Sequence, residues 1–108
     1  MPKFITFFSY TGESAKAMIN KPSDRAAAAR TIVESIGGSM ESFYWMQGKH
    51  DGLFIYSVKD SASAAAIAIA VGSTGAITGI QTHQIFDRDE QATIVETAKK
   101  VTYKPPTA

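Results

Sequence analysis

The 108-residue chain contains no cysteine, little proline and no long hydrophobic run. Without cysteine there are no disulfides and no thiolate metal sites, and the sequence gives no clue to a redox compartment. The longest apolar run, Ala64 to Val71, is far shorter than the roughly 20 residues that cross a membrane. The N-terminus has no apolar run of signal-peptide length. We therefore expect a cytoplasmic protein with no membrane partner.

Charge of either sign is also scarce. The chain has 11 Lys and Arg against 10 Asp and Glu, which leaves a net charge of +1. Because no cluster of basic residues stands out, we do not expect nucleic acid as a partner. The two histidines and the scattered carboxylates lack metal-ligand spacing, so we expect neither a metal nor another cofactor. A hydrophobic fraction of 44% is typical of one globular domain, here expected to span residues 1–108.

Hydrophobic periodicity and helix-capping residues predict the order of the elements. Asp60 and Asp87 are expected to cap helices, Asp87 together with Glu90 in a capping box. Pro22 suits the first turn of a helix that ends at Gly37-Gly38. The expected strands are 4–10, 39–47, 52–58 and 75–86; the expected helices are 13–19, 22–36, 62–71 and one after Asp87, followed by a flexible tail at about 104–108.

This order predicts an α+β, ferredoxin-like βαββαβ fold with a four-stranded antiparallel sheet and a C-terminal helix. The first strand carries Phe4 and Phe8 on one face but Ile5 and Phe7 on the other. An antiparallel sheet with helices on one side should instead have a polar second face. We therefore expect a homodimer in which two sheets pack face to face.

Residues spread over nearly the whole chain resemble the GYD-domain family. They are Ser9-Tyr10-Thr11, Arg25, Gly37-Gly38, the turn from Gly48 to Asp51, Asp60 before an Ala-rich helix, and Gly75. In the turn, His50 stands where the family usually has Tyr. The resemblance implies a dimeric α+β barrel, a superfamily that includes cofactor-free monooxygenases, isomerase-like enzymes, haem enzymes and proteins of unknown role. It implies no general activity, since a fold does not determine a function.

Three polar residues are candidates for catalysis. A neutral His50 beside the Asp51 carboxylate could act as a general base. Alternatively, Asp51 stabilises the hairpin turn and His50 is exposed. His83 could line a polar pocket or ligate a haem iron, or it could be a polar residue at the rim of the sheet.

Three aromatic residues are candidates for ligand binding: Tyr10, Tyr44 and Trp45. Aromatic walls with polar tips suit a flat organic ligand, although the same residues could serve the core or a dimer contact. Three functions remain open. The protein binds a small apolar or aromatic molecule between sheet and helices, or it is a cofactor-independent monooxygenase or isomerase acting on an aromatic metabolite, or it is a structural or regulatory dimer without a ligand site.

Overall fold

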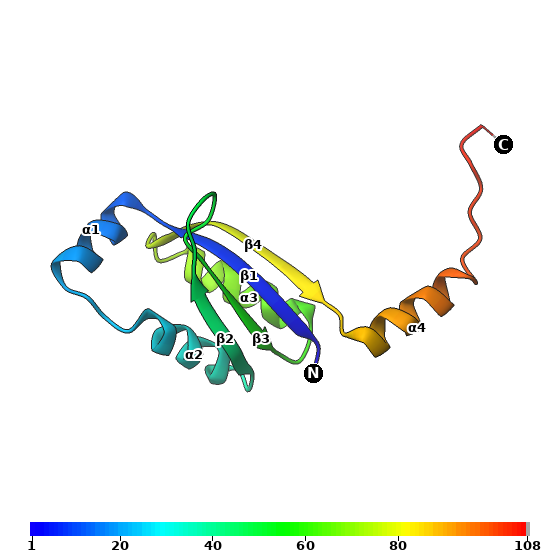
Figure 1. The fold of residues 1–108 in the computed structure, drawn as a ribbon, viewed down its shortest axis with the longest axis horizontal. Helices are drawn as coiled ribbons and strands as arrows, with labels where there is room; N and C mark the ends of the chain where they lie inside the picture. The colour runs from blue at the N-terminus through cyan, green and yellow to red at the C-terminus, as the bar shows by residue number, and fades with distance from the viewer. Residues whose placement is uncertain (108) are drawn as a thin grey trace.

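A computed structural model describes residues 1–107 of the chain (Figure 1). Ala108, the last residue of the predicted tail, lies outside the described residues. The elements are β1 (Lys3–Tyr10), α1 (Gly12–Asn20), α2 (Arg25–Ser35), β2 (Ser39–Trp45), β3 (Gly52–Ser57), α3 (Ser61–Gly72), β4 (Ile77–Ile85) and α4 (Arg88–Ala98).

The four strands form one antiparallel sheet in the order β2-β3-β1-β4. The strand β1 lies in the interior of the sheet, where Phe4 pairs with Tyr56 of β3 and with Gln84 of β4. The predicted α+β, ferredoxin-like fold with a C-terminal helix is confirmed. The sheet has two edge strands, β2 and β4, and the chain leaves β4 to enter α4 (Figure 1).

Each edge strand contains one bulge. In β2 the pairing with β3 shifts between Met40 and Ser42, and in β4 the pairing with β1 shifts opposite Phe7 to Ser9. In both places the extra residue is on the edge strand. Strict alternation along the expected strand 39–47 would place Met40 and Phe43 on opposite faces. This is wrong at the start of the strand, because Met40 pairs with Tyr56 and lies on the same face as Phe43.

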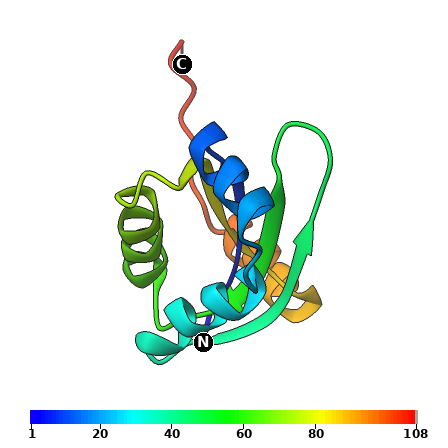
Figure 2. The ribbon, with the colours of Figure 1, turned by 90° about the vertical axis from the view of Figure 1, so that its left-hand side faces the viewer.

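The helices α2 and α3 cover one face of the sheet, which we call the helix-covered face (Figure 2). The helix α2 packs on β2, and α3 packs on β4. Small residues of the helices let them approach the large aromatic residues of the strands. The buried core contains Phe4, Phe8, Met40, Phe54, Tyr56 and Val58 from the sheet side with Ala29, Val33, Ala64 and Ile67 from the two helices.

Side-chain caps set where the helices begin. Asp60 accepts from the Ser63 amide, and Asp87 and Glu90 form a reciprocal capping box, as predicted. The helix α2 begins at Arg25 rather than at Pro22, because the Asp24 carboxylate accepts from the Ala27 amide and caps it there.

The C-terminal arm, residues 86–103, projects beyond the end of the sheet and contains α4 (Figure 1). The molecule measures 60 × 34 × 23 Å, and its radius of gyration is 17.3 Å. A compact chain of this length would have a radius of gyration of about 13 Å. The extended arm accounts for the excess. No helix within residues 1–107 combines the length and the hydrophobicity that a membrane crossing needs.

Candidate functional site

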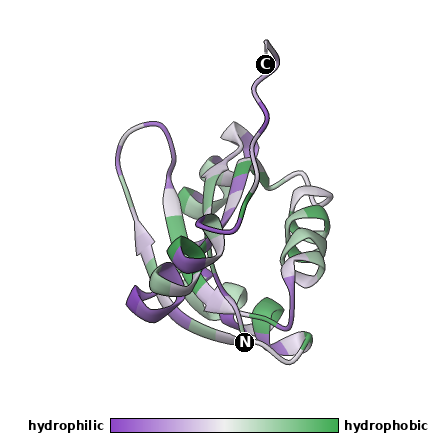
Figure 3. Cartoon of the chain, turned by 90° about the vertical axis from the view of Figure 1, so that its right-hand side faces the viewer, coloured by the Kyte–Doolittle hydropathy of each residue, from purple (hydrophilic) through white to green (hydrophobic). Residues whose placement is uncertain are grey.

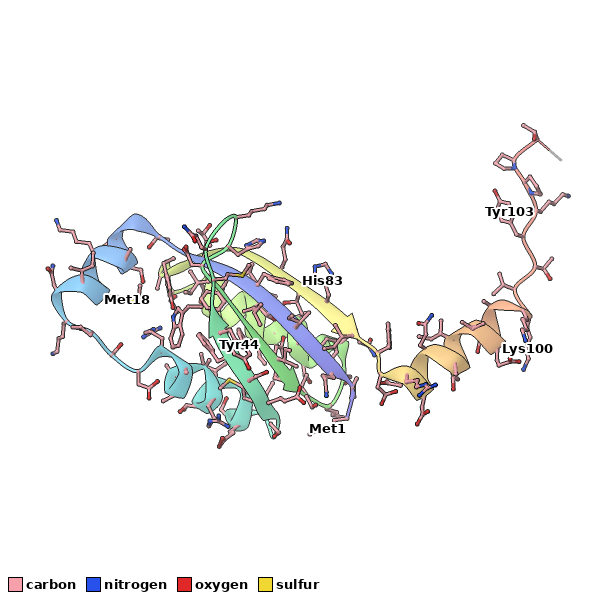
Figure 4. All side chains as sticks on the ribbon, viewed as in Figure 1. Met1, Met18, Tyr44, His83, Lys100 and Tyr103 are labelled. Atoms are coloured by element: carbon pink, nitrogen blue, oxygen red, sulfur yellow. The ribbon has the colours of Figure 1, made fainter. Side chains whose placement is uncertain are left out.

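The predicted site residues are divided between the two faces of the sheet. Tyr10 and Trp45 lie on the helix-covered face, where the Trp45 indole donates to the Tyr10 hydroxyl at 3.1 Å. Tyr44 and His83 lie on the opposite face, which no helix covers; we call it the open face. Figure 4 shows Tyr44 on β2 and His83 on β4, at the two edges of the sheet. The structure therefore does not assemble the predicted residues into one site.

A pocket opens between the sheet and the helices α2 and α3. Its cavity volume is about 60 Å³. Sites for drug-sized ligands have roughly 300–1,000 Å³, so this pocket suits only a small ligand. The lining is mostly apolar: Phe8, Phe43, Phe54, Ile77 and Ile80 from the sheet, and Ala28, Ala29, Ile32, Ile67, Ala68 and Val71 from the helices.

Three polar residues, Thr6, Tyr10 and Arg25, complete this lining. Thr6 is already satisfied, since its hydroxyl bonds to Tyr56 at 2.8 Å and to Thr82 at 3.0 Å. Tyr10 accepts from Trp45 and keeps its own proton to donate. Arg25 is the only charged residue of the lining, and within residues 1–107 it forms no ion pair. Arg25 and Tyr10 are therefore the groups that can bind the polar end of a ligand.

The Tyr56 hydroxyl is part of the buried network beneath the pocket. Tyr56 has no exposed surface, and burial raises the pKa of its hydroxyl because the phenolate would lose its hydration. The bonds from Thr6 and Thr82 favour the charged form but only partly oppose this shift. Burial thus favours the neutral form of Tyr56, whose hydroxyl is held in the buried network by Thr6.

The open face carries apolar residues on neighbouring strands. Ile5 of β1 pairs with Ile55 of β3, and Phe7 of β1 pairs with Leu53 of β3. All four side chains are half-buried in the single chain. They form a continuous apolar patch at the centre of a face that no element of the described chain covers.

The loop between β2 and β3 holds His50 over the edge of this patch. His50 is only 9% exposed, and its ring lies 5.4 Å from the ring of Phe7. Its Nδ1 atom has no hydrogen-bond partner in the described part of the chain. The ring of His83 also contacts Phe7, at 6.2 Å between centroids. Phe7 thus stands between the two histidines.

Asp51 anchors the same loop to β1. Its carboxylate accepts from the Tyr10 amide at 2.8 Å, and its own amide donates to the Phe8 carbonyl at 2.8 Å. No hydrogen bond joins Asp51 to His50 within residues 1–107. The carboxylate therefore supports the loop and is not paired with the imidazole.

A family model for the GYD domain matches residues 4–95. The chain belongs to the GYD-domain family. The match runs from β1 into α4, so it includes the pocket, the open face and most of the C-terminal helix. A comparison with curated proteins found no matching relative.

In this GYD domain, the sequence indicated one aromatic residue of the pocket lining, Tyr10, but not the lining residues on the helices α2 and α3. Arg25 was noted only as part of the resemblance. Its spacing to Ala28, Ala29 and Ile32 is i, i+3, i+4 and i+7, which places all four on one side of a helix. That pattern was the available signal that a cation stands at one end of an apolar helix face.

Proposed function

We propose that this GYD-domain protein is a homodimer that binds a small apolar or aromatic carboxylate in the pocket between the sheet and the helices α2 and α3. The observation that carries the proposal is an apolar lining with one cation, Arg25, which forms no ion pair within the described residues 1–107. A guanidinium favours a carboxylate because it offers two parallel donors. The hydroxyl of Tyr10 supplies a further donor.

Binding fits this pocket better than proton transfer does. Its lining, as the described residues define it, includes no imidazole and no carboxylate. His50 and His83 lie across the sheet from it. A monooxygenase or isomerase that used either histidine as its base would have to bind its substrate at the open face. We therefore propose a binding protein in preference to an enzyme.

Calorimetric titration with octanoate and with octanol tests the site. These probes share an apolar chain and differ in charge, so Arg25→Gln should weaken octanoate binding about tenfold and leave octanol unchanged. Arg88→Gln, on the exposed surface of α4, is the matched control and should change neither. Equal loss of both probes in Arg25→Gln would show that Arg25 does not select the charge.

Filling the pocket tests its location. Ala68 is half-buried in the lining, and Ala68→Phe should occupy the space and abolish binding of both probes. Ala28→Leu, from the other helix, is the second variant if Ala68→Phe fails to fold. If either variant folds and still binds the probes with wild-type affinity, the binding site is not this pocket. No binding of either probe by the wild-type protein would favour a structural dimer without a ligand site.

The homodimer is supported by the open face. A hydrophobic patch at the centre of a sheet is unusual on a soluble monomer and typical of an interaction surface. A second copy offers the same patch, and a twofold axis lets each copy cover the other. The partner surface would also enclose Phe7 and the ring of His50, whose Nδ1 atom has no hydrogen-bond partner within residues 1–107.

Light scattering at micromolar concentration tests the dimer. The wild-type protein should have twice the mass of one chain, and Phe7→Asp should dissociate it, because the change removes an aromatic ring and adds a charge that must lose its hydration at the centre of the interface. Ala66→Asp, on the exposed side of α3, should remain a dimer. A monomeric wild-type protein would overturn this part of the proposal.

A further inference from the structure

The helix α4 has no cover within its own chain. None of its residues is buried, and it packs against no other element in the described part of the molecule. Figure 1 shows it separated from the sheet, and Figure 4 places Lys100 and Tyr103 on the far side of it. The body of the same chain therefore does not explain why this segment is helical.

Local sequence alone does not stabilise such a helix. Its capping box fixes where it begins, but it has only 11 residues. Isolated helices shorter than about 12–15 residues are marginal in water. Most helical stability in proteins comes from packing of an apolar face, and α4 has such a face.

One side of the arm is apolar. Ile94, Val95, Ala98 and Val101 follow each other at helical spacing, and three of them are large residues exposed by 40%, 46% and 68% (Ile94, Val95 and Val101). By helical spacing, the charged residues Asp89 and Glu96 lie on the opposite side of α4. Figure 3 shows both hydrophobic and hydrophilic segments on α4. This is the pattern of a helix with one buried face.

The arm begins beside the open face of the sheet. Ile85, the last residue of β4, pairs with Lys3 and so points to the open face, and the exposed Phe86 follows it. The arm thus begins at the margin of the patch formed by Ile5, Phe7, Leu53 and Ile55. A partner that covers the patch reaches the base of the arm as well.

We infer that α4 docks on the second copy of the chain through Ile94, Val95, Ala98 and Val101. Each arm of the dimer would then contact the other copy. The inference rests on the proposed homodimer. If a twofold axis pairs the open faces, α4 of each copy can pack on the other copy in the same way. This contact would extend the interface beyond the sheet. It would also stabilise α4, whose helical structure is only marginally stable in isolation.

Hydrogen exchange of the α4 amides tests the arm separately from the dimer. In the wild-type dimer these amides should exchange at least about tenfold more slowly than in an unfolded chain. In the monomer produced by Phe7→Asp they should lose this protection. Ile94→Asp should also remove it and weaken dimerisation about tenfold. Thr93→Asp, the neighbouring substitution on the charged side, should change neither.

The outcomes separate the two proposals. If the wild-type protein is a dimer but its α4 amides are unprotected, the proposed docking of the arm is wrong and the proposed dimer still stands. Protection that persists in the Phe7→Asp monomer also overturns the arm, because α4 would then pack on its own chain. A monomeric wild-type protein overturns the dimer and the arm together.

Discussion

On the helix-covered face of the sheet, Phe4, Phe8 and Tyr56 are buried by α2 and α3. On the open face, Ile5 and Phe7 are equally apolar but only half-buried. The same strand supplies both sets, since alternate residues of β1 point to opposite sides. The difference lies in what covers each face: two helices of the same chain cover the first, and no helix of the described residues covers the second.

The largest expected effect separates two neighbours in β3. Tyr56→Ala should lower the free energy of unfolding by about 3–5 kcal/mol, because it empties a fully buried site. Ile55→Ala, on the open face, should cost about 1–2 kcal/mol in dilute protein. That cost should grow with protein concentration, because the proposed dimer would bury Ile55. Urea denaturation of both variants at two protein concentrations about 100-fold apart measures these costs. A large cost of Ile55→Ala that does not depend on protein concentration would contradict the expected difference between the two faces.

A smaller effect is expected where the helix-covered face is tightest. A Cβ atom at Gly52 would lie 2.5 Å from Cζ of Phe8, so Gly52→Ala forces the buried ring to move. We expect a cost of about 1–3 kcal/mol. Gly12→Ala is the control, since nothing lies within 4 Å of its Cβ position. Thermal denaturation of both variants decides whether close packing, and not loss of glycine as such, is responsible.

The loop that holds His50 against the open face depends on Asp51. Asp51→Asn should remove the charge from its bond to the Tyr10 amide, and we expect a cost of about 1.5 kcal/mol. The His50 ring should then become more mobile relative to Phe7. Chemical shifts of the His50 ring in the two proteins report this change. An unchanged environment would mean that packing on Phe7, and not Asp51, positions the ring.

The smallest expected effect is a loss of stability at high pH. The pKa of Tyr56 is raised in the folded protein by burial, whereas an unfolded tyrosine titrates at about pH 10. Its contribution is therefore complete below about pH 10 and is lost as the pH rises further, because only the unfolded chain ionises readily. Tyr56→Phe should flatten this decline, and Tyr103→Phe, at an exposed site, should not. Denaturation at about pH 8 and pH 10.5 measures the difference.

The sequence predicted the order of the elements, because caps such as Asp60 and Asp87 act on their own first turns. It also predicted that both faces of the sheet are apolar. It did not predict the bulge in β2, which depends on the pairing of Met40 with Tyr56, 16 positions further along the chain. Nor did it separate Tyr10 from His50, since the side of the sheet on which a loop residue packs is set by tertiary contacts such as that with Phe7.

The bulges in β2 and β4 have a consequence for how copies of this chain meet. An edge strand with regular, unpaired amides and carbonyls is a template for another strand, and repeated edge addition grows without limit. Here both free edges are interrupted, one near Met40 and one opposite Phe7 to Ser9. A locally twisted edge disfavours such addition. In the proposed dimer, the copies would instead meet through the broad surface of the sheet, and a twofold contact of that kind is complete with two copies and cannot grow into an open-ended fibre.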